Sequence, residues 1–200
     1  MPASPTPAGN FQKDTPIPQA AEIKTLIEIH RLEMSFRSPE GRSIPVLKID
    51  KWELAGGAQV ALVGPSGSGK TTFLHLLAGI RTPTAGEVSV GGRNISALSE
   101  SARDEWRSRT IGYVFQNYYL FPALTVLDNT ILPLTFAGCP ARERTARARQ
   151  ILDRLELGHR SSFYPRQLSA GEKQRAIIAR AVVNHPQLIL ADEPSANLDA

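Results

Sequence analysis

The chain is poor in residues that form covalent or metal-bound cross-links. It has one cysteine among 200 residues, Cys139, which excludes an internal disulfide. Its four histidines lack the spacing of metal ligands. No run of about eighteen apolar residues occurs, so no segment predicts a transmembrane helix. The first residues lack a basic region followed by an apolar one, so we predict no secretory signal. These absences favour a reducing cytosol.

Positive charge is only slightly in excess over negative charge. The net charge is +4, and charged residues make up 21% of the chain against 42% hydrophobic residues. These proportions are typical of a soluble globular domain and argue against a disordered chain. The small positive excess is compatible with nucleic acid, with an acidic membrane surface, or with a solvated surface rich in arginine. We favour the last interpretation.

Proline is concentrated at the start of the chain, where five of the fifteen prolines fall within the first eighteen residues. Such a stretch cannot bury enough apolar surface to offset the entropy of ordering it. We therefore predict a disordered tail over residues 1–21 and a single folded domain over residues 22–200.

Strand and helix patterns alternate through the predicted domain. The first expected strand begins near Glu22, and further strands are expected at Val46–Leu54, Gln59–Val63, Thr110–Phe115 and Leu188–Ala191. A loop is expected at Ser38–Ser43 and a hairpin turn at Gly91-Gly92. The expected helices are Thr71–Ala78, a segment around Ala148–Leu155, and Glu172–Asn184. Continuous apolar runs predict that Gln59–Val63 and Leu188–Ala191 are buried strands. The alternation predicts an α/β fold with a parallel sheet.

A glycine-rich loop lies between a predicted strand and a predicted helix. Residues 64–71, GPSGSGKT, fit the pattern G-x-x-x-x-G-K-[ST]. Glycine lets the backbone turn tightly, so a row of N–H groups and the positive end of the following helix can hold phosphates. Lys70 supplies a positive charge and Thr71 a hydroxyl for Mg²⁺. A chance glycine-serine turn is the weaker interpretation in this context. A dinucleotide site is also disfavoured, because Lys70 and Thr71 suit a metal-bound triphosphate.

Two carboxylates, Asp192 and Glu193, follow the last predicted strand. In open α/β sheets, ligands bind at the carboxyl ends of the strands. Asp192 is therefore placed to hold Mg²⁺, and Glu193 to polarise a water that attacks the γ-phosphate. An ordinary acidic turn before Pro194 is the alternative, and the upstream phosphate loop makes it much weaker.

The order of motifs resembles that of the ABC transporter ATPases. Leu168-Ser-Ala-Gly-Glu172 looks like their signature, and it lies between a strand-end glutamine, Gln116, and the acidic pair. Ser195–Asp199 resembles the D-loop. The segments Thr82–Gly86, Leu124–Asn129 and Ala191–Asp199 look most like the lipoprotein-release, macrolide-export and cell-division branch.

The resemblance implies ATP and Mg²⁺ as ligands and assigns roles to individual residues. Residues expected to contact ATP are Phe36, Gly64, Pro65, Ser66, Gly67, Ser68, Gly69, Lys70, Thr71 and Thr72, with Ser169, Ala170, Gly171 and Glu172 acting from a second copy. The expected catalytic residues are Glu193, Lys70 and Gln116, and the expected metal contacts are Thr71, Gln116 and Asp192.

The resemblance also implies an architecture and partners. We expect a P-loop NTPase α/β core with an antiparallel β subdomain and a helical insert, over about residues 117–180, that carries the ABC signature. Two copies would close head-to-tail around ATP with Asp199 at the seam, on the cytoplasmic face of the cell membrane. Tyr118–Phe121 would contact a transmembrane permease, or would pack into the core as aromatic residues usually do. Nucleic acid is not expected as a partner.

Some features depart from the family pattern and keep other functions open. Ala170 replaces the commoner glycine of the signature, and Glu172 the commoner glutamine. The sequence ends at Ala200, before the strand and γ-phosphate histidine of the family. An ATP-dependent switch with little turnover, or a truncated product, is therefore the alternative to a transport ATPase. A DNA-repair ABC protein is disfavoured, because the chain has one cysteine and a short insert.

Overall fold

The computed structural model describes residues 25–194. The tail predicted over residues 1–21, the predicted strand start at Glu22 and the D-loop-like segment Ser195–Asp199 lie outside these residues, and so does the expected dimer-seam residue Asp199.

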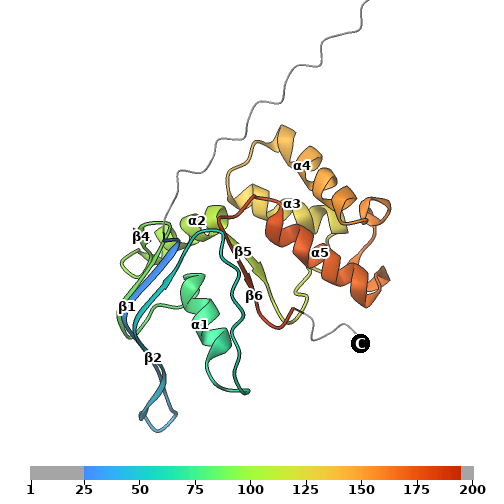
Figure 1. Ribbon diagram of the computed structural model, residues 1–200. Helices are drawn as coiled ribbons and strands as arrows, with labels where there is room; N and C mark the ends of the chain where they lie inside the picture. Colours follow the sequence, from blue (N-terminus) through green and yellow to red (C-terminus); the bar gives the residue numbers. More distant parts are fainter. Residues whose placement is uncertain (1–24, 195–200) are drawn as a thin grey trace, which may run out of the picture.

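An antiparallel sheet forms the first layer (Figure 1). It has the order β2-β1-β3-β4 and comprises β1 (Ile27–Arg37), β2 (Ser43–Leu54), β3 (Ala85–Val90) and β4 (Arg93–Asn94). Ile29 of β1 lies opposite Trp52 on β2 and Val88 on β3, and Ile29 and Val88 are fully buried. Gly91 and Gly92 turn β3 into β4 with φ of 58° and 75°, the left-handed region that glycine tolerates. The predicted hairpin is therefore confirmed.

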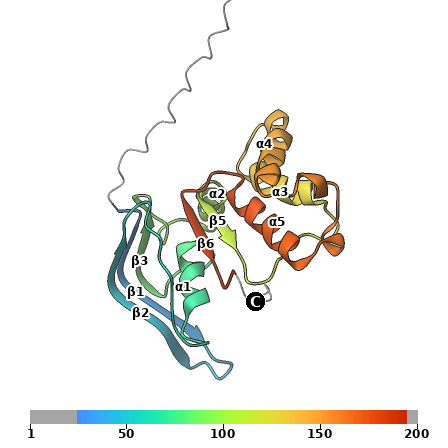
Figure 2. The ribbon, with the colours of Figure 1, turned by 45° about the vertical axis from the view of Figure 1, so that its right-hand side comes forward.

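Helix α1 (Lys70–Leu77) separates this sheet from a pair of parallel strands, as Figures 1 and 2 both show. The pair consists of β5 (Ile111–Val114) and β6 (Leu188–Ala191). Their parallel pairing confirms the predicted α/β character. The main core forms where α1 meets the sheet and β6, and it includes Leu32, Leu76, Leu77, Val88 and Leu190.

A group of helices covers the other side of β5 (Figure 2). It comprises α3 (Val126–Phe136), α4 (Ala141–Arg154) and α5 (Ala170–Val182), with 3₁₀ turns at Gly158–Arg160 and Pro165–Gln167. These helices share a hydrophobic core of their own, which includes Val126, Leu134, Leu152 and Ala176. Ile177 and Ala181 connect α5 to Val114 of β5. Within residues 25–194, no helix is both long and apolar enough to cross a bilayer.

The prediction of a buried strand at Gln59–Val63 is wrong. The segment forms no strand, and Val60 and Val63 are 56% and 94% exposed. Among the described residues β6 pairs only with β5, and a cavity of about 390 Å³ is lined by both this segment and the free side of β6. Both segments line this cavity and do not pair, so no described strand bonds the backbone groups of residues 59–63. For the same reason β6 is half-buried rather than buried, and Ile189 is 54% exposed.

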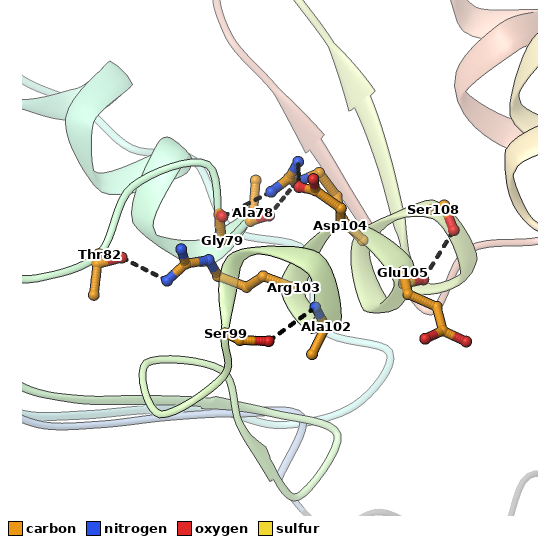
Figure 3. Close-up of polar contacts among 10 residues, drawn as sticks. Ala78, Gly79, Thr82, Ser99, Ala102, Arg103, Asp104, Glu105 and Ser108 are labelled. Atoms are coloured by element: carbon orange, nitrogen blue, oxygen red, sulfur yellow. Dashed lines mark hydrogen bonds and ion pairs between the residues drawn. The ribbon is translucent and has the colours of Figure 1, made fainter.

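Helix α2 (Glu100–Thr110), which the sequence patterns did not predict, fixes the end of α1. The guanidinium of Arg107 donates from Nε to the carbonyl of Ala78 at 3.0 Å and from an Nη to that of Gly79 at 2.8 Å. Figure 3 shows these two carbonyls, and beside them Arg103 donating to Thr82. Carbonyl groups at a helix C-terminus have no partner within the helix, so Arg107 satisfies groups that would otherwise be orphaned.

We expect Arg107→Met to lower the free energy of unfolding by about 1–3 kcal/mol, because two partly buried carbonyls lose a charged donor. Urea unfolding followed by circular dichroism measures the change. Arg109→Met is the matched control, since Arg109 forms an exposed pair with Glu105 on the same helix and such pairs contribute about 0–1 kcal/mol. Equal loss in the two variants would contradict the capping role.

Candidate functional site

The glycine-rich loop leads directly into α1. Gly67 and Gly69 have φ of 78° and 89°, and Gly69 is the residue that precedes the helix. No side chain caps this end of α1, so the N–H groups of its first turn and the helix dipole are directed at the loop. The ammonium of Lys70 donates to the carbonyls of Gly64 and Pro65, each at 2.9 Å, and therefore lies across the same loop.

The remaining loop residues leave the cradle open to solvent. Pro65, Ser66, Ser68 and Thr71 are exposed, while Thr72 is half-buried in the first turn of α1. A Cβ at Gly64 would come within 2.9 Å of the Ser68 hydroxyl, so a larger residue would crowd the turn. The uncapped helix end, the lysine and the exposed hydroxyl form a donor set that suits a phosphate chain.

The acidic turn lies at the carboxyl end of the parallel strands. The Asp192 N–H donates to the Val114 carbonyl at 2.9 Å, which extends the pairing of β5 with β6 by one residue. Gln116, just beyond β5, donates from Nε2 to Glu193 Oε2 at 2.7 Å. The structure thus brings together the strand-end glutamine and the carboxylate that the sequence nominated as catalytic.

Asp192 interacts electrostatically with His75 on α1, the helix that follows the phosphate loop. Asp192 is 8% exposed. Burial lowers the pKa of His75 on α1, the charge of Arg81 lowers it further, and the charge of Asp192 acts in the opposite direction. Burial raises the pKa of Tyr113 on β5, and Asp192 adds to that rise. Asp192 therefore lies near both α1 and β5, where an oxygen ligand for a hard cation is expected. The imidazole of His75 packs near the Tyr113 ring, with 5.9 Å between centroids.

Phe36, the residue expected to stack on adenine, lies near the end of β1. Its ring is half-buried and packs against the main core. The guanidinium carbon of Arg81 lies 4.9 Å from the ring centroid, so one face of Phe36 is covered by a cation.

The signature residues form the first turn of α5. The Ser169 hydroxyl accepts the Glu172 N–H at 3.2 Å, and the Glu172 carboxylate accepts the Ser169 N–H at 2.8 Å, which is a complete capping box. Arg160 Nε donates to the same carboxylate at 2.7 Å. Ala170 and Gly171 are helical, so Ala170 in place of glycine causes no strain. Glutamate at position 172 forms an ion pair with Arg160, which a neutral glutamine could not form.

The signature and the phosphate loop are not brought together within one chain. Helices α1 and α5 lie on opposite sides of the β5–β6 pair in both views of the ribbon (Figures 1 and 2). The residues expected to act from a second copy therefore form a separate surface.

A model of the ABC transporter family matches residues 47–196, well over half of the chain. The chain belongs to the ABC transporter family. As a member it is an ATP-binding, ATP-hydrolysing subunit, which confirms the function that the motif order predicts.

Similar proteins come from bacterial lipoprotein-releasing systems. The ATP-binding protein LolD 2 of Caulobacter vibrioides is 45% identical over 174 residues, which cover 87% of this chain and 76% of that protein. LolD of Pseudomonas fluorescens is 44% identical over 178 residues, 88% of this chain and 78% of that one. These matches confirm the family assigned from the sequence.

Two solved structures of an ABC cassette have the same fold. The dimeric structure of MJ0796, a bacterial ABC transporter cassette, matches with a TM-score of 0.79 and 36% identity over 87% of this chain and 76% of that one. A post-hydrolysis dimer of the same cassette, bound to ADP and Pi, matches with a TM-score of 0.80 and 36% identity over 88% and 77%.

The sequence allowed two interpretations of Tyr118–Phe121, contact with a permease or packing into the core, and each fits some of its residues. Tyr119 and Phe121 are 61% and 54% exposed, whereas Tyr118 and Leu120 pack against α5 and β5. Alternate residues of the segment are thus available to a partner.

Three residues that the sequence did not nominate hold the loops of this ABC cassette in place. Arg180 of α5 donates to the carbonyls of Tyr119 and Tyr118 at 2.6 and 3.2 Å. The fully buried Asn129 accepts the Phe121 N–H at 2.8 Å and donates to three carbonyls in residues 121–125. Gln174 donates to the Pro194 carbonyl at 2.6 Å. For Asn129 the available signal was an amide within a largely apolar helix, whereas Gln174 and Arg180 lie on a helix with several other polar residues and gave no such signal.

The capping box at the signature predicts that the stability of the fold depends on pH. The backbone N–H of Ser169 and then the Arg160 guanidinium lower the pKa of Glu172 to about 2, from an ordinary value of 4.5. Because the pKa is lower in the folded state, this carboxylate stabilises the fold above pH 4.5, and the stabilisation is lost as pH falls toward 2.

We therefore expect Glu172→Gln to unfold with a weaker dependence on pH than the unmodified chain across this acid range. Thermal or urea unfolding at a series of pH values measures the difference. Glu100→Gln, at an exposed position on α2, should leave the slope unchanged. A Glu172→Gln profile parallel to that of the unmodified chain would contradict the role of the charge.

Proposed function

We propose that this chain hydrolyses MgATP at a site built from the glycine-rich loop, Gln116, Asp192 and Glu193, and thereby drives a separate membrane permease. The observation that carries the proposal is the convergence of Gln116 and Glu193, 2.7 Å apart, at the ends of the parallel strands. The electrostatic link between Asp192 and α1 supports placing this acidic turn beside the phosphate loop.

Each residue has a role that its chemistry suits. Lys70 and the N–H groups at the start of α1 hold the β- and γ-phosphates, and the other residues of the loop, from Gly64 to Thr72, shape the cradle. Thr71, Gln116 and Asp192 supply oxygen ligands for Mg²⁺, which neutralises phosphate charge when bound. Glu193 accepts a proton from the attacking water. Phe36 stacks on the base, which takes the place of Arg81 over the exposed part of the ring.

The second half of the site comes from another copy of the chain. The residues Ser169–Glu172 present a capped helix start, whose hydroxyl and N–H groups suit the γ-phosphate of a facing copy. The dimeric MJ0796 cassette supports a homodimer for this chain as well. In this arrangement residues 117–180 form a helical subdomain that carries the signature toward the partner copy.

The membrane partner is a permease that receives the motion of this helical subdomain. Exposed Tyr119 and Phe121 supply an apolar contact next to Gln116, so a change at the nucleotide can reach the interface. The LolD relatives support a permease of the lipoprotein-releasing kind. The chain then lies on the cytoplasmic face of the membrane as a peripheral subunit, and nucleic acid is not a partner.

Glu193→Gln tests the hydrolytic assignment. We expect the steady-state rate of phosphate release to fall by about 10²–10⁴-fold, the usual contribution of a general base, with ATP affinity preserved. Glu87→Gln, at an exposed position on β3, is the control and should hydrolyse ATP at the unmodified rate. Turnover that survives in Glu193→Gln would overturn the assignment.

Ser169→Asp tests the facing site. Aspartate keeps the helix cap, so the variant should fold and its monomer should bind ATP normally. Its negative charge repels the γ-phosphate, so the ATP-dependent dimer should disappear in light-scattering measurements. Ser162→Asp, at an exposed position before the signature, should dimerise as the unmodified chain does. Persistence of the dimer in Ser169→Asp would count against closure through the signature.

A further inference from the structure

A buried amide on α5 reaches from the signature helix to the acidic turn. Gln174 is only 7% exposed, although its neighbours in the helix core, Ala176 and Ile177, are apolar. Its Nε2 donates to the carbonyl of Pro194 at 2.6 Å. A buried amide is costly unless it is hydrogen-bonded, so this contact accounts for a polar residue at a core position.

The turn that receives this hydrogen bond has an unfavourable backbone. Glu193 has a φ of 47°, a conformation that residues other than glycine rarely adopt and that must be held by its surroundings. Three contacts hold it. The Asp192 N–H donates to Val114, the Gln116 amide donates to the Glu193 carboxylate, and Gln174 donates to Pro194.

These contacts act on different sides of Glu193. The Asp192 bond fixes the backbone before Glu193, and the Gln174 bond fixes the backbone after it. The anchored groups lie one residue to each side of Glu193, so the backbone between them has limited freedom and the Glu193 carboxylate has a defined direction. Without the Gln174 bond the backbone can relax from the left-handed region, and the carboxylate would move away from Gln116.

We propose that Gln174 is a positioning residue for ATP hydrolysis, which holds Glu193 in its active direction through the Pro194 carbonyl. The proposal rests on the role of Glu193 given above. It has a further consequence, because Ser169 and Gln174 belong to one helix and lie about 7.5 Å apart along its axis. Displacement of the signature therefore displaces the contact that aligns Glu193.

The test begins with Gln174→Met, which keeps the length of the side chain and removes the donor. We expect kcat for ATP to fall by about tenfold or more, a part of the contribution of a general base, while KM changes by less than about twofold. Gln150→Met makes the same change at an exposed position on α4 and should leave both constants unaltered. An unchanged kcat in Gln174→Met would overturn the proposal.

A double variant distinguishes positioning of Glu193 from a general effect on the fold. If Gln174 acts through Glu193, then Gln174→Met added to Glu193→Gln should lower the rate no further. A further tenfold loss in the double variant would overturn the proposal while leaving the role of Glu193 intact. Full turnover in Glu193→Gln alone would instead remove the proposed function.

A second measurement does not require turnover. Amide hydrogen exchange reports how firmly the turn is held, because the Asp192 N–H is protected by its bond to Val114. We expect faster exchange at Asp192 in Gln174→Met, with exchange in α4 unchanged and the Gln150→Met control like the unmodified chain. Equal exchange at Asp192 in all three proteins would contradict the proposal whatever their activity.

Discussion

The parallel pairing of β5 with β6 is the contact on which the site depends. It continues one residue beyond the strands, where the Asp192 N–H bonds the Val114 carbonyl. That register places Gln116 and Glu193 side by side and leaves Asp192 buried near α1. A slip of β6 by one residue would turn Asp192 and Glu193 to the opposite face of the pair and away from Gln116. The chemistry at the strand ends is therefore fixed by backbone hydrogen bonds.

Helix α5 acts as a rigid support for three separate loops. Its first residues cap themselves through Ser169 and Glu172, its middle contacts the acidic turn through Gln174, and its later part holds the segment after Gln116 through Arg180. Because a helix transmits displacement along its length with little bending, the signature, the acidic turn and the expected permease contact are mechanically connected. This arrangement suits an ABC ATPase, whose chemistry must be linked to motion elsewhere.

Features with a local sequence signal were predictable, and features without one were not. The glycine-rich loop has a fixed residue spacing, α1 has a run of buried apolar residues, and α5 begins with a capping box. Helix α2 buries only Trp106 and Thr110, so its apolar period is weak, and α3 contains Pro133, which argues against a helix in a sequence. Both helices form because tertiary packing offsets their poor local preference.

The sequence by itself determined the phosphate-binding loop, the acidic pair and the family, because these depend on residue types at short fixed spacings. Only the tertiary structure decided that Gln116 meets Glu193 across 77 positions of the chain, that Gln174 bonds Pro194, and that residues 59–63 remain unpaired. Such contacts join segments that the fold brings together from far apart. Periodicity and local propensity do not carry this information, since they describe how a segment folds and not which neighbour it meets.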